Sequence, residues 1–234
     1  MKKNKFLSFF FSKYFPHFLS KNFFAVYSKG HIEVKKILSQ SSSTPKIFVL
    51  NHSNWWDGVL IPFLDLSFFQ SNGYCLMEKK QIDKNKFFGK IGAIEIVREN
   101  SFQSIKSLKT CIELLKSQNT SLYIFPQGKI EENGTGENNF KFEKGIEYII
   151  KNFEKIILIN CLVNYKFVRE QKPELFLNFF ETVELNGIKL DKNFINEEES
   201  KFRNRQKLFD EEYKTNSLNN YELILKGKKS KDKR

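Results

Sequence analysis

The sequence predicts an α/β protein with a mostly parallel sheet flanked by helices and an amphipathic helical segment at the N-terminus. Short apolar runs alternate with longer segments of helical periodicity, which is the pattern of β–α–β units. The run at 46–50 is almost continuously apolar, as expected of a strand that is buried on both faces. Polar residues follow several runs directly, at the edge of the sheet where ligands bind in open α/β folds.

The chain of 234 residues is long enough for one large α/β domain with its own core. We expect three segments. Residues 1–45 form a helical segment suited to a membrane interface, and residues 46–190 form the α/β domain. Residues 191–234 form a charged helix and a basic tail, which we expect to be disordered because lysines crowd it from residue 226 onward.

The N-terminal stretch 4–28 is rich in Phe and Tyr, is punctuated by lysines and contains Pro16. We predict two short helices that break at Pro16, because proline cannot donate a helical hydrogen bond. Their aromatic faces and basic edges suit either the interface of an anionic membrane or packing against the domain. A further helix within 30–45 ends in a Ser-rich loop.

The remaining elements follow from periodicity. Strands are expected at 46–50, 74–77, 93–97, 121–125, 155–163 and 175–180, and helices at 57–69, 101–115, 143–153 and 197–213. The helix at 101–115 has the clearest apolar face, and Asn100 with Gln103 before and within its first turn resembles a capping box.

A candidate catalytic pair follows the strand at 46–50. His52 lies directly after it, and Asp57 lies five residues later at the start of a helix. A general base needs an imidazole with one nitrogen free and the other held by an acceptor, which a nearby carboxylate supplies. The alternative is that His52 packs or caps, and that Asp57 caps the helix.

Two further predicted strands also end in polar groups. Arg98 follows one, and Gln127, Gly128 and Lys129 follow the other. The carboxyl ends of parallel strands lie at one edge of a sheet, so these residues and His52 can face one cleft. We therefore predict a functional site at this edge.

Three stretches carry a family resemblance. Residues 51–57 have the pattern N-H-x-x-x-x-D, residues 92–98 the pattern G-x-I-x-x-x-R, and residues 125–128 the pattern F-P-x-G. In this order and spacing, over roughly residues 46–185, they resemble the motifs of the glycerolipid acyltransferase superfamily of lysophosphatidate and glycerol-3-phosphate acyltransferases.

The resemblance implies an O-acyltransferase that moves a fatty acyl group from a thioester to a lipid hydroxyl. The donor would be acyl-CoA or acyl carrier protein, and the acceptor a lysophospholipid such as 1-acylglycerol-3-phosphate. His52 would be the general base and Asp57 its orienting carboxylate. No cofactor is implied, and no covalent intermediate is needed, because a thioester is already activated.

The resemblance also implies substrate-binding residues. Arg98, Lys80 and Lys129 are candidates for anionic groups, and Gln127 and Gly128 complete the set, with backbone N–H groups around Gly128 as candidate oxyanion donors. The stretch that begins at Lys80 is similar to a segment that precedes the second motif in the family.

The third and fourth motifs depart from the family. Residues 127–131 read Q-G-K-I-E where the family has E-G-T-R-S, so Ile130 replaces the arginine associated with acceptor phosphate. Lys129 offers a point charge in place of a bidentate fork. Asn160 stands where a proline is expected in a late strand. A neutral acceptor such as a glycolipid or carotenoid glycoside, thioester hydrolysis, and a non-catalytic lipid-binding role therefore stay open.

Composition narrows the partners. A net charge of +12 attracts anionic lipid, an acidic carrier protein, coenzyme A or nucleic acid. No helix-turn-helix, RNP or zinc pattern supports nucleic acid. The three histidines and three cysteines lack metal-ligand spacing, so we expect no metal and buried cysteines. Without a spanning-length apolar run or a signal-peptide pattern, we expect a cytoplasmic protein, peripheral on the inner face of the membrane.

Overall fold

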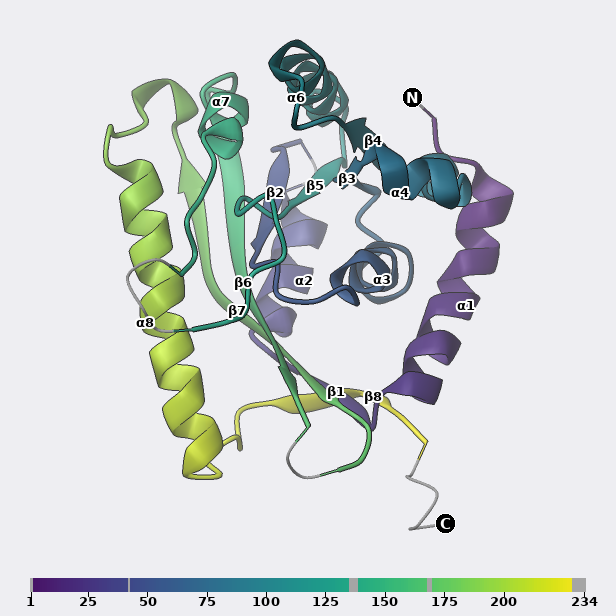
Figure 1. Cartoon of the computed structure of the whole chain (residues 1–234). Coiled ribbons are helices and arrows are strands. Elements are labelled where there is room, and N and C mark those ends of the chain that lie inside the picture. The colour runs from purple at the N-terminus through teal and green to yellow at the C-terminus, as the bar shows by residue number, and fades with distance from the viewer. Residues whose placement is uncertain (1, 42, 135–138, 168–169, 229–234) are drawn as a thin grey trace.

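The computed structural model describes residues 2–41, 43–134, 139–167 and 170–228. Its centre is an eight-stranded sheet with the order β4-β3-β5-β2-β6-β7-β1-β8 (Figure 1). The strands are β1 (Ala25–Lys29), β2 (Lys46–Leu50), β3 (Gly73–Glu78), β4 (Ala93–Ile96), β5 (Ser121–Ile124), β6 (Ile156–Lys166), β7 (Glu174–Leu185) and β8 (Glu222–Lys226). Neighbours are parallel except at β6/β7 and β1/β8. The predicted fold class is confirmed.

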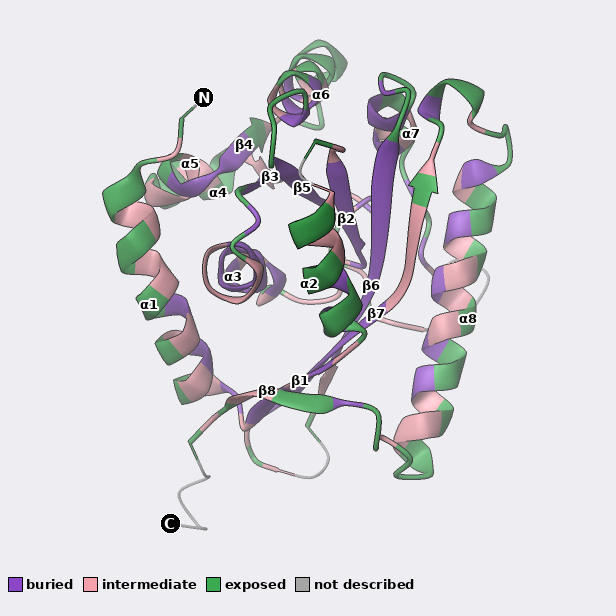
Figure 2. Ribbon diagram, turned by 180° about the vertical axis from the view of Figure 1, so that it is seen from behind, coloured by how far each residue is buried: buried purple, intermediate pink, exposed green. Residues whose placement is uncertain are grey.

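Helices cover both faces of the sheet, and an apolar cluster fills each interface. One face carries α1 (Lys5–Asn22), α2 (His31–Gln40), α3 (Asp57–Pro62) with its π-helical continuation η1 (Phe63–Phe69), and α5 (Phe87–Ile91). The other carries α6 (Ser101–Leu115), α7 (Gly145–Ile150) and α8 (Phe194–Lys214). The short α4 (Lys79–Lys84) and the 3-10 helix η2 (Gly187–Lys189) complete the elements. Figure 2 shows the buried central strands between helices whose outer faces are exposed.

The predicted strands and helices between residues 46 and 190 are present, with some shifts at their ends. The Asn100 side chain caps α6 as expected, accepting a hydrogen bond from the Gln103 N–H at 3.0 Å. β6 and β7 are longer than predicted because they pair with each other along their whole length as an antiparallel hairpin. α4 and α5 were not expected.

The predicted break at Pro16 is wrong, because α1 runs through this residue as a single helix. The lost hydrogen bond would have gone to the carbonyl of Ser12, four residues earlier. That carbonyl instead accepts a hydrogen bond from the Ser67 hydroxyl at 2.8 Å. The buried side chains of Phe15 and Leu19 hold the helix on the sheet on either side of the proline.

The segments outside residues 46–190 also belong to the sheet. β1 pairs in parallel with β7, and β8 pairs with β1 in the antiparallel sense. The expectation of tail alone after the C-terminal helix is therefore wrong for Glu222–Lys226, whose apolar centre adds an edge strand. The basic residues 229–234 lie outside the described residues.

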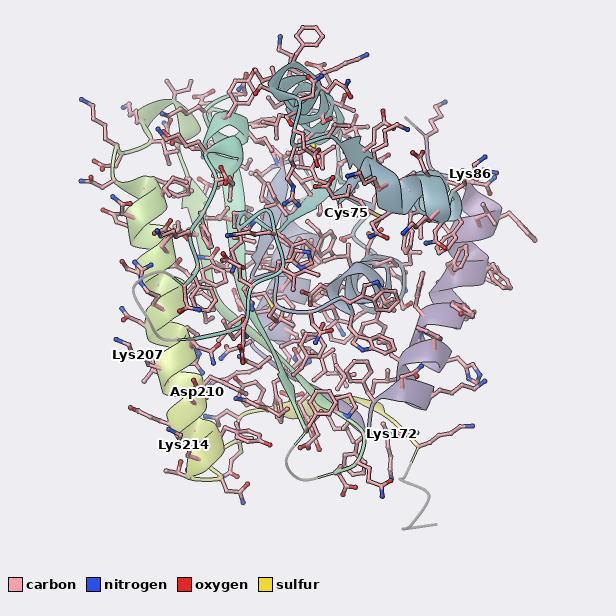
Figure 3. The ribbon with its side chains drawn as sticks, viewed as in Figure 1. Cys75, Lys86, Lys172, Lys207, Asp210 and Lys214 are labelled. Atoms are coloured by element: carbon pink, nitrogen blue, oxygen red, sulfur yellow. The ribbon has the colours of Figure 1, made fainter. Side chains whose placement is uncertain are left out.

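Basic side chains are spread over several elements. Lys86 beside α5 and Lys207 and Lys214 of α8 reach outward on different sides of the molecule, whereas Cys75 lies inside (Figure 3). All three cysteines are buried, as expected, and burial raises the pKa of the Cys75 and Cys111 thiols to about 12. A thiol with such a pKa is a poor nucleophile at neutral pH.

Candidate active site

Four parallel strands deliver the predicted site residues to one edge of the sheet. β2 ends before His52, β5 before Gln127 and β4 before Arg98, while β3 ends at Glu78. Two contacts join these ends. The Gln127 side chain accepts a hydrogen bond from the His52 backbone N–H at 2.6 Å, and the Arg98 guanidinium packs beside Gly128. The convergence expected from the sequence is therefore present.

His52 and Asp57 form a hydrogen-bonded pair. The distance between Nδ1 of His52 and Oδ2 of Asp57 is 2.8 Å. Oδ2 also accepts hydrogen bonds from the backbone N–H groups of Ser53 at 2.9 Å and Asn54 at 3.0 Å. Since an ionised carboxylate only accepts, Nδ1 must carry the proton, and Nε2 is left as an acceptor without a hydrogen-bond partner among the described residues.

The exposure of the two side chains suits unequal roles. The Asp57 side chain is completely buried, whereas 19% of the His52 side chain is exposed. A substrate proton can therefore reach the imidazole but not the carboxylate. This is the arrangement expected of a general base with an orienting acid residue. The alternative that Asp57 caps the helix is wrong, because Trp56 is the N-cap of α3 and Oδ2 of Asp57 bonds to His52, Ser53 and Asn54.

The backbone of His52 is held on both sides. Its N–H donates to Gln127, as described above, and its carbonyl accepts a hydrogen bond from the Glu131 N–H at 2.8 Å. The ring of Phe125 stacks on the imidazole with 4.5 Å between ring centroids. These contacts fix the position of the imidazole before any substrate arrives.

Gln127 differs from the expectation that it contacts substrate. Its side chain is buried, and its Nε2 donates to Oε2 of Glu131 at 3.1 Å while its Oε1 accepts from His52. Both ends of the amide are therefore used within the protein. Gln127 ties the loop after β5 to the loop after β2.

The backbone conformation at position 128 requires glycine. Its φ of +74° lies in the left-handed region, and a Cβ at this position would lie 3.3 Å from Nη1 of Arg98. Its N–H donates to the carbonyl of Phe125 at 3.0 Å. The turn after Pro126 therefore uses the N–H of Gly128 itself, and the other backbone N–H groups around Gly128 stay candidate oxyanion donors.

Each of the three predicted anion-binding cations has a carboxylate partner. Nε of Arg98 lies 2.7 Å from Glu78, Nζ of Lys80 lies 3.7 Å from Glu99, and Nζ of Lys129 lies 2.8 Å from Glu131. The hydrogen bond that Lys129 donates to Glu131, followed by the charge of this carboxylate, raises the pKa of Lys129. Lys80 and Lys129 are highly exposed, and Arg98 is partly so. Exposed pairs of this kind exchange partners at little cost.

Several residues near the pair were not predicted as site residues. The Tyr165 hydroxyl donates to Oδ1 of Asp57 at 2.6 Å. The Asn51 side chain accepts a hydrogen bond from the Val163 N–H at 2.6 Å and donates one to the Val163 carbonyl at 3.0 Å. Asn133 donates to the same carbonyl and accepts from Asn51. Their only signal in the sequence is polarity beside an apolar run, which many surface residues share.

Asn160, the residue at the expected fourth motif, lies away from the pair. Its amide nitrogen donates to Glu198 at 2.6 Å and to Glu181 at 3.0 Å, so it faces α8. It pairs in register with Val49, three residues before His52. The structure thus gives Asn160 a role in packing α8 on the sheet.

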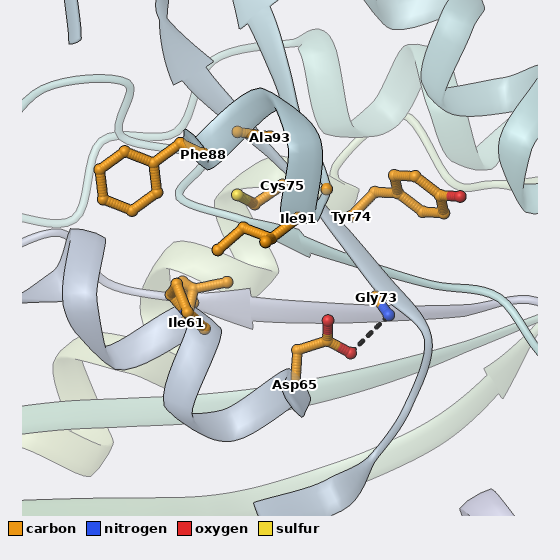
Figure 4. Close-up of a pocket in the computed structure, with 10 residues that line it drawn as sticks. Ile61, Asp65, Gly73, Tyr74, Cys75, Phe88, Ile91 and Ala93 are labelled. Atoms are coloured by element: carbon orange, nitrogen blue, oxygen red, sulfur yellow. Dashed lines mark hydrogen bonds between the residues drawn. The ribbon is translucent and has the colours of Figure 1, made fainter. Parts of the chain in front are cut away.

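A small cavity beside β3 contains a second buried carboxylate, Asp65 (Figure 4). Oδ1 of Asp65 accepts from the Gly73 N–H at 2.5 Å and the Ser71 hydroxyl at 3.0 Å, and Lys3 pairs with Oδ2 at 2.6 Å. The space suffices for about one water molecule. Asp65 is thus satisfied by structural partners and has no room for a substrate.

Comparisons with known proteins agree with this geometry. A model of the acyltransferase family matches residues 31–163, more than half of the chain. The crystal structure of the 1-acyl-sn-glycerophosphate (LPA) acyltransferase PlsC from Thermotoga maritima has a similar fold, with a TM-score of 0.58 and 17% sequence identity over 88% of this chain and 79% of that chain. No curated protein sequence matches. The chain therefore belongs to the acyltransferase family.

Proposed function

We propose that the protein transfers a fatty acyl group from acyl-CoA or acyl carrier protein to the hydroxyl of a lipid, with 1-acylglycerol-3-phosphate as the foremost acceptor. The observation that carries the proposal is the His52–Asp57 pair, whose Nδ1 is engaged and whose Nε2 is open. Membership of the family supports the reaction class. The structural neighbour acts on 1-acyl-sn-glycerophosphate, which supports this class of acceptor.

The geometry suits one direct transfer. Nε2 of His52 takes the proton of the acceptor hydroxyl while its oxygen attacks the thioester carbon. The tetrahedral intermediate collapses with formation of the C–O ester bond and loss of the C–S bond. The imidazolium, stabilised by Asp57, returns the proton to the leaving thiolate, so that the products are an ester and a free thiol.

This function is tested by comparing His52→Ala with the natural chain. The rate at which each releases thiol from acyl-CoA is measured with and without lysophosphatidate. We expect turnover to fall by roughly 10²–10⁴-fold, the usual contribution of a general base. His17→Ala is the matched control, because His17 is exposed on α1.

Each other outcome identifies an alternative. Undiminished turnover in folded His52→Ala would refute the assignment of the base. Thiol release that does not need an acceptor would mark a thioesterase. Lipid binding without thiol release from any donor would mark a non-catalytic relative.

A neutral lipid alcohol is the second candidate acceptor, for two reasons. Ile130 cannot bind phosphate, and the nearby Lys129 is already paired with Glu131. A phosphate with two negative charges can still displace an exposed carboxylate partner, and Arg98 offers a planar fork beside Gly128. We therefore place the phosphate-bearing acceptor first.

A competition assay separates the two acceptors. Lysophosphatidate and a neutral glycolipid alcohol are offered together, and the amounts of the two ester products are compared by mass spectrometry. We expect the phosphate ester to dominate and Lys129→Ala to raise the KM for lysophosphatidate about two- to fivefold, since the lysine is exposed. Lys207→Ala on α8 is the control. Preference for the neutral alcohol would overturn the phosphate assignment and leave the acyl transfer standing.

We further propose that the protein works as a peripheral protein on the inner face of the cytoplasmic membrane. No helix in the described ranges is long and apolar enough to cross a bilayer. α1 exposes Phe6, Phe9 and Phe10, and lysines such as Lys5 and Lys13 flank them. Exposed aromatic rings beside cations suit the headgroup layer of an anionic membrane.

Sedimentation with vesicles tests the membrane proposal. The triple variant Phe6→Ser, Phe9→Ser, Phe10→Ser should lose most binding to vesicles that contain phosphatidylglycerol, without loss of fold, because these rings are exposed. Phe102→Ser, which removes an exposed ring from α6, is the control. Equal sedimentation of the triple variant and the natural chain would show that these rings of α1 are not the membrane contact.

A further inference from the structure

The carboxylate of Asp57 accepts four hydrogen bonds, and its two oxygens are used differently. Oδ2 receives the imidazole and two backbone N–H groups. Oδ1 receives the hydroxyl of Tyr165 at 2.6 Å, from a residue 108 positions away in β6. Among the described residues, Tyr165 is the partner of Oδ1. Without it, this oxygen would be buried with no donor, and the carboxylate could rotate.

Tyr165 is itself held in place by the sheet and by aromatic packing. It pairs in register with Leu175 of β7, and its ring lies 6.0 Å from the ring of the fully buried Phe23. Two residues earlier, Val163 is bonded to Asn51, the residue before the base. The end of β6 is therefore hydrogen-bonded to the loop after β2, the same loop that contains Asp57, the partner of the Tyr165 hydroxyl.

The electrostatics keep the Tyr165 hydroxyl a donor. Removal from water, followed by the charge of Asp57, raises the pKa of Tyr165 well above its ordinary value. The other titratable group of β6 near Asp57 is Cys161, and burial raises its pKa as well. On the neighbouring loop, the carboxylate of Glu131 is bonded to Gln127 and Lys129, and only the backbone N–H of Glu131 contacts the pair, at the carbonyl of His52. Thus the Tyr165 hydroxyl keeps its proton and donates it to Oδ1 of Asp57.

We propose that Tyr165 is a positioning residue for acyl transfer: its hydroxyl fixes Oδ1 of Asp57, so that Oδ2 faces Nδ1 of His52 and Nε2 faces the acceptor. This rests on the proposed function for its effect on turnover, but its effect on the imidazole does not. Tyr165 touches neither the acceptor nor the thioester in this scheme. It acts through Asp57 alone, and its removal should change kcat and leave KM unchanged.

The experiment compares Tyr165→Phe with Tyr123→Phe in the full chain. Tyr123 also has a buried hydroxyl, but its hydrogen-bond partner is Ser71, at 2.8 Å, and not Asp57. Tyr165→Phe should lower kcat roughly tenfold, as loss of a hydrogen bond to a charged group does, with KM unchanged. Tyr123→Phe should leave both constants unchanged.

A double-mutant cycle makes the test specific. In an Asp57→Asn background, Tyr165→Phe should lower kcat less than about twofold, because the carboxylate through which it acts is gone. A tenfold loss in both backgrounds would overturn the proposal, since Tyr165 would then act by another route. Full kcat in folded Tyr165→Phe would overturn it too.

Nitrogen NMR of the His52 ring separates this proposal from the proposed function. The natural chain should show one neutral tautomer with the proton on Nδ1, and Tyr165→Phe should show a mixture, while Tyr123→Phe should not. His52→Gln identifies the resonances. A mixture of tautomers in a protein that transfers no acyl group would sustain the role of Tyr165 and refute the function. A single unchanged tautomer in Tyr165→Phe would refute the role of Tyr165 whatever the activity.

Discussion

Two pairs of a histidine and a carboxylate lie within the described part of the chain, and they differ in distance, burial and hydrogen bonding. His52 lies 2.8 Å from Asp57, whereas Nε2 of His31 lies 3.8 Å from Glu222, beyond hydrogen-bond distance. The Asp57 side chain is buried and bonded on both oxygens, but 62% of the Glu222 side chain is exposed. The partly open imidazole belongs to His52, while His31 is closed off against Phe68.

The comparison shows that proximity of the two residue types does not define a base. Burial lowers the pKa of His31, and the charge of Glu222 offsets this only in part because the carboxylate is solvated. His31 is therefore a neutral core residue at the start of α2. In the other pair the carboxylate is the buried, fixed partner, and the imidazole is the accessible one. A buried carboxylate with an accessible imidazole suits His52 to exchange a proton with a substrate.

The largest expected difference is in turnover. Asp57→Asn should lower kcat by roughly 10³–10⁴-fold, the effect of losing the orienting carboxylate of a catalytic triad, because the amide no longer fixes the tautomer of His52. Glu222→Gln should leave kcat unchanged. Both are measured as thiol release per folded molecule. Equal losses in the two variants would show that neither carboxylate has a special place in the reaction.

The sequence allowed one half of this comparison to be predicted. The position of His52 after a buried strand, with Asp57 five residues later, suggested the pair, and the family resemblance favoured it over a capping role. The structure shows the two side chains in hydrogen-bond contact. The parallel sheet followed from the alternation of apolar runs and amphipathic segments. Such inferences succeed because they depend on neighbours in the chain, where spacing fixes geometry.

The other features depend on contacts between distant segments. The hydrogen bond from Tyr165 to Asp57 joins residues 108 positions apart, and a tyrosine in a strand is usually explained by packing alone. The continuity of α1 through Pro16 depends on Ser67, a residue of η1. β8 requires β1 as its partner. No local pattern encodes these, so they could not be predicted from one sequence.

A smaller difference should appear in stability. The pKa of His31 is lower in the folded chain than the ordinary value of 6.5, so the unfolded state binds the proton more readily as the pH falls below that value. Above it both states are neutral and His31 makes no contribution. Below it stability should be lost by at most about 1.4 kcal/mol per pH unit for this one proton.

Urea unfolding of His31→Gln at pH 8 and pH 5 measures the contribution of His31 to the free energy of unfolding. The free energy of unfolding of the variant should fall less between the two pH values than that of the natural chain. His17→Gln, at an exposed position, should match the natural chain. A larger fall in His31→Gln than in the natural chain would contradict the buried neutral state of His31.

The smallest effect concerns Glu222 itself. Its charge raises the pKa of His31, so Glu222→Gln should lower that pKa further. Protonation of His31 then becomes less favourable in the folded chain, and Glu222→Gln should be less stable than the natural chain at pH 5 while matching it at pH 8. Because the carboxylate is mostly exposed, the difference should stay below about 1 kcal/mol. Salt at 1 M should reduce it further, since screening acts on exposed charges.

Glu184→Gln removes another exposed carboxylate, paired with Lys155, and serves as the control. A deficit of several kcal/mol at both pH values would mean that Glu222 supports β8 directly, and the contrast between a fixed and a solvated carboxylate would then have to be abandoned for this pair.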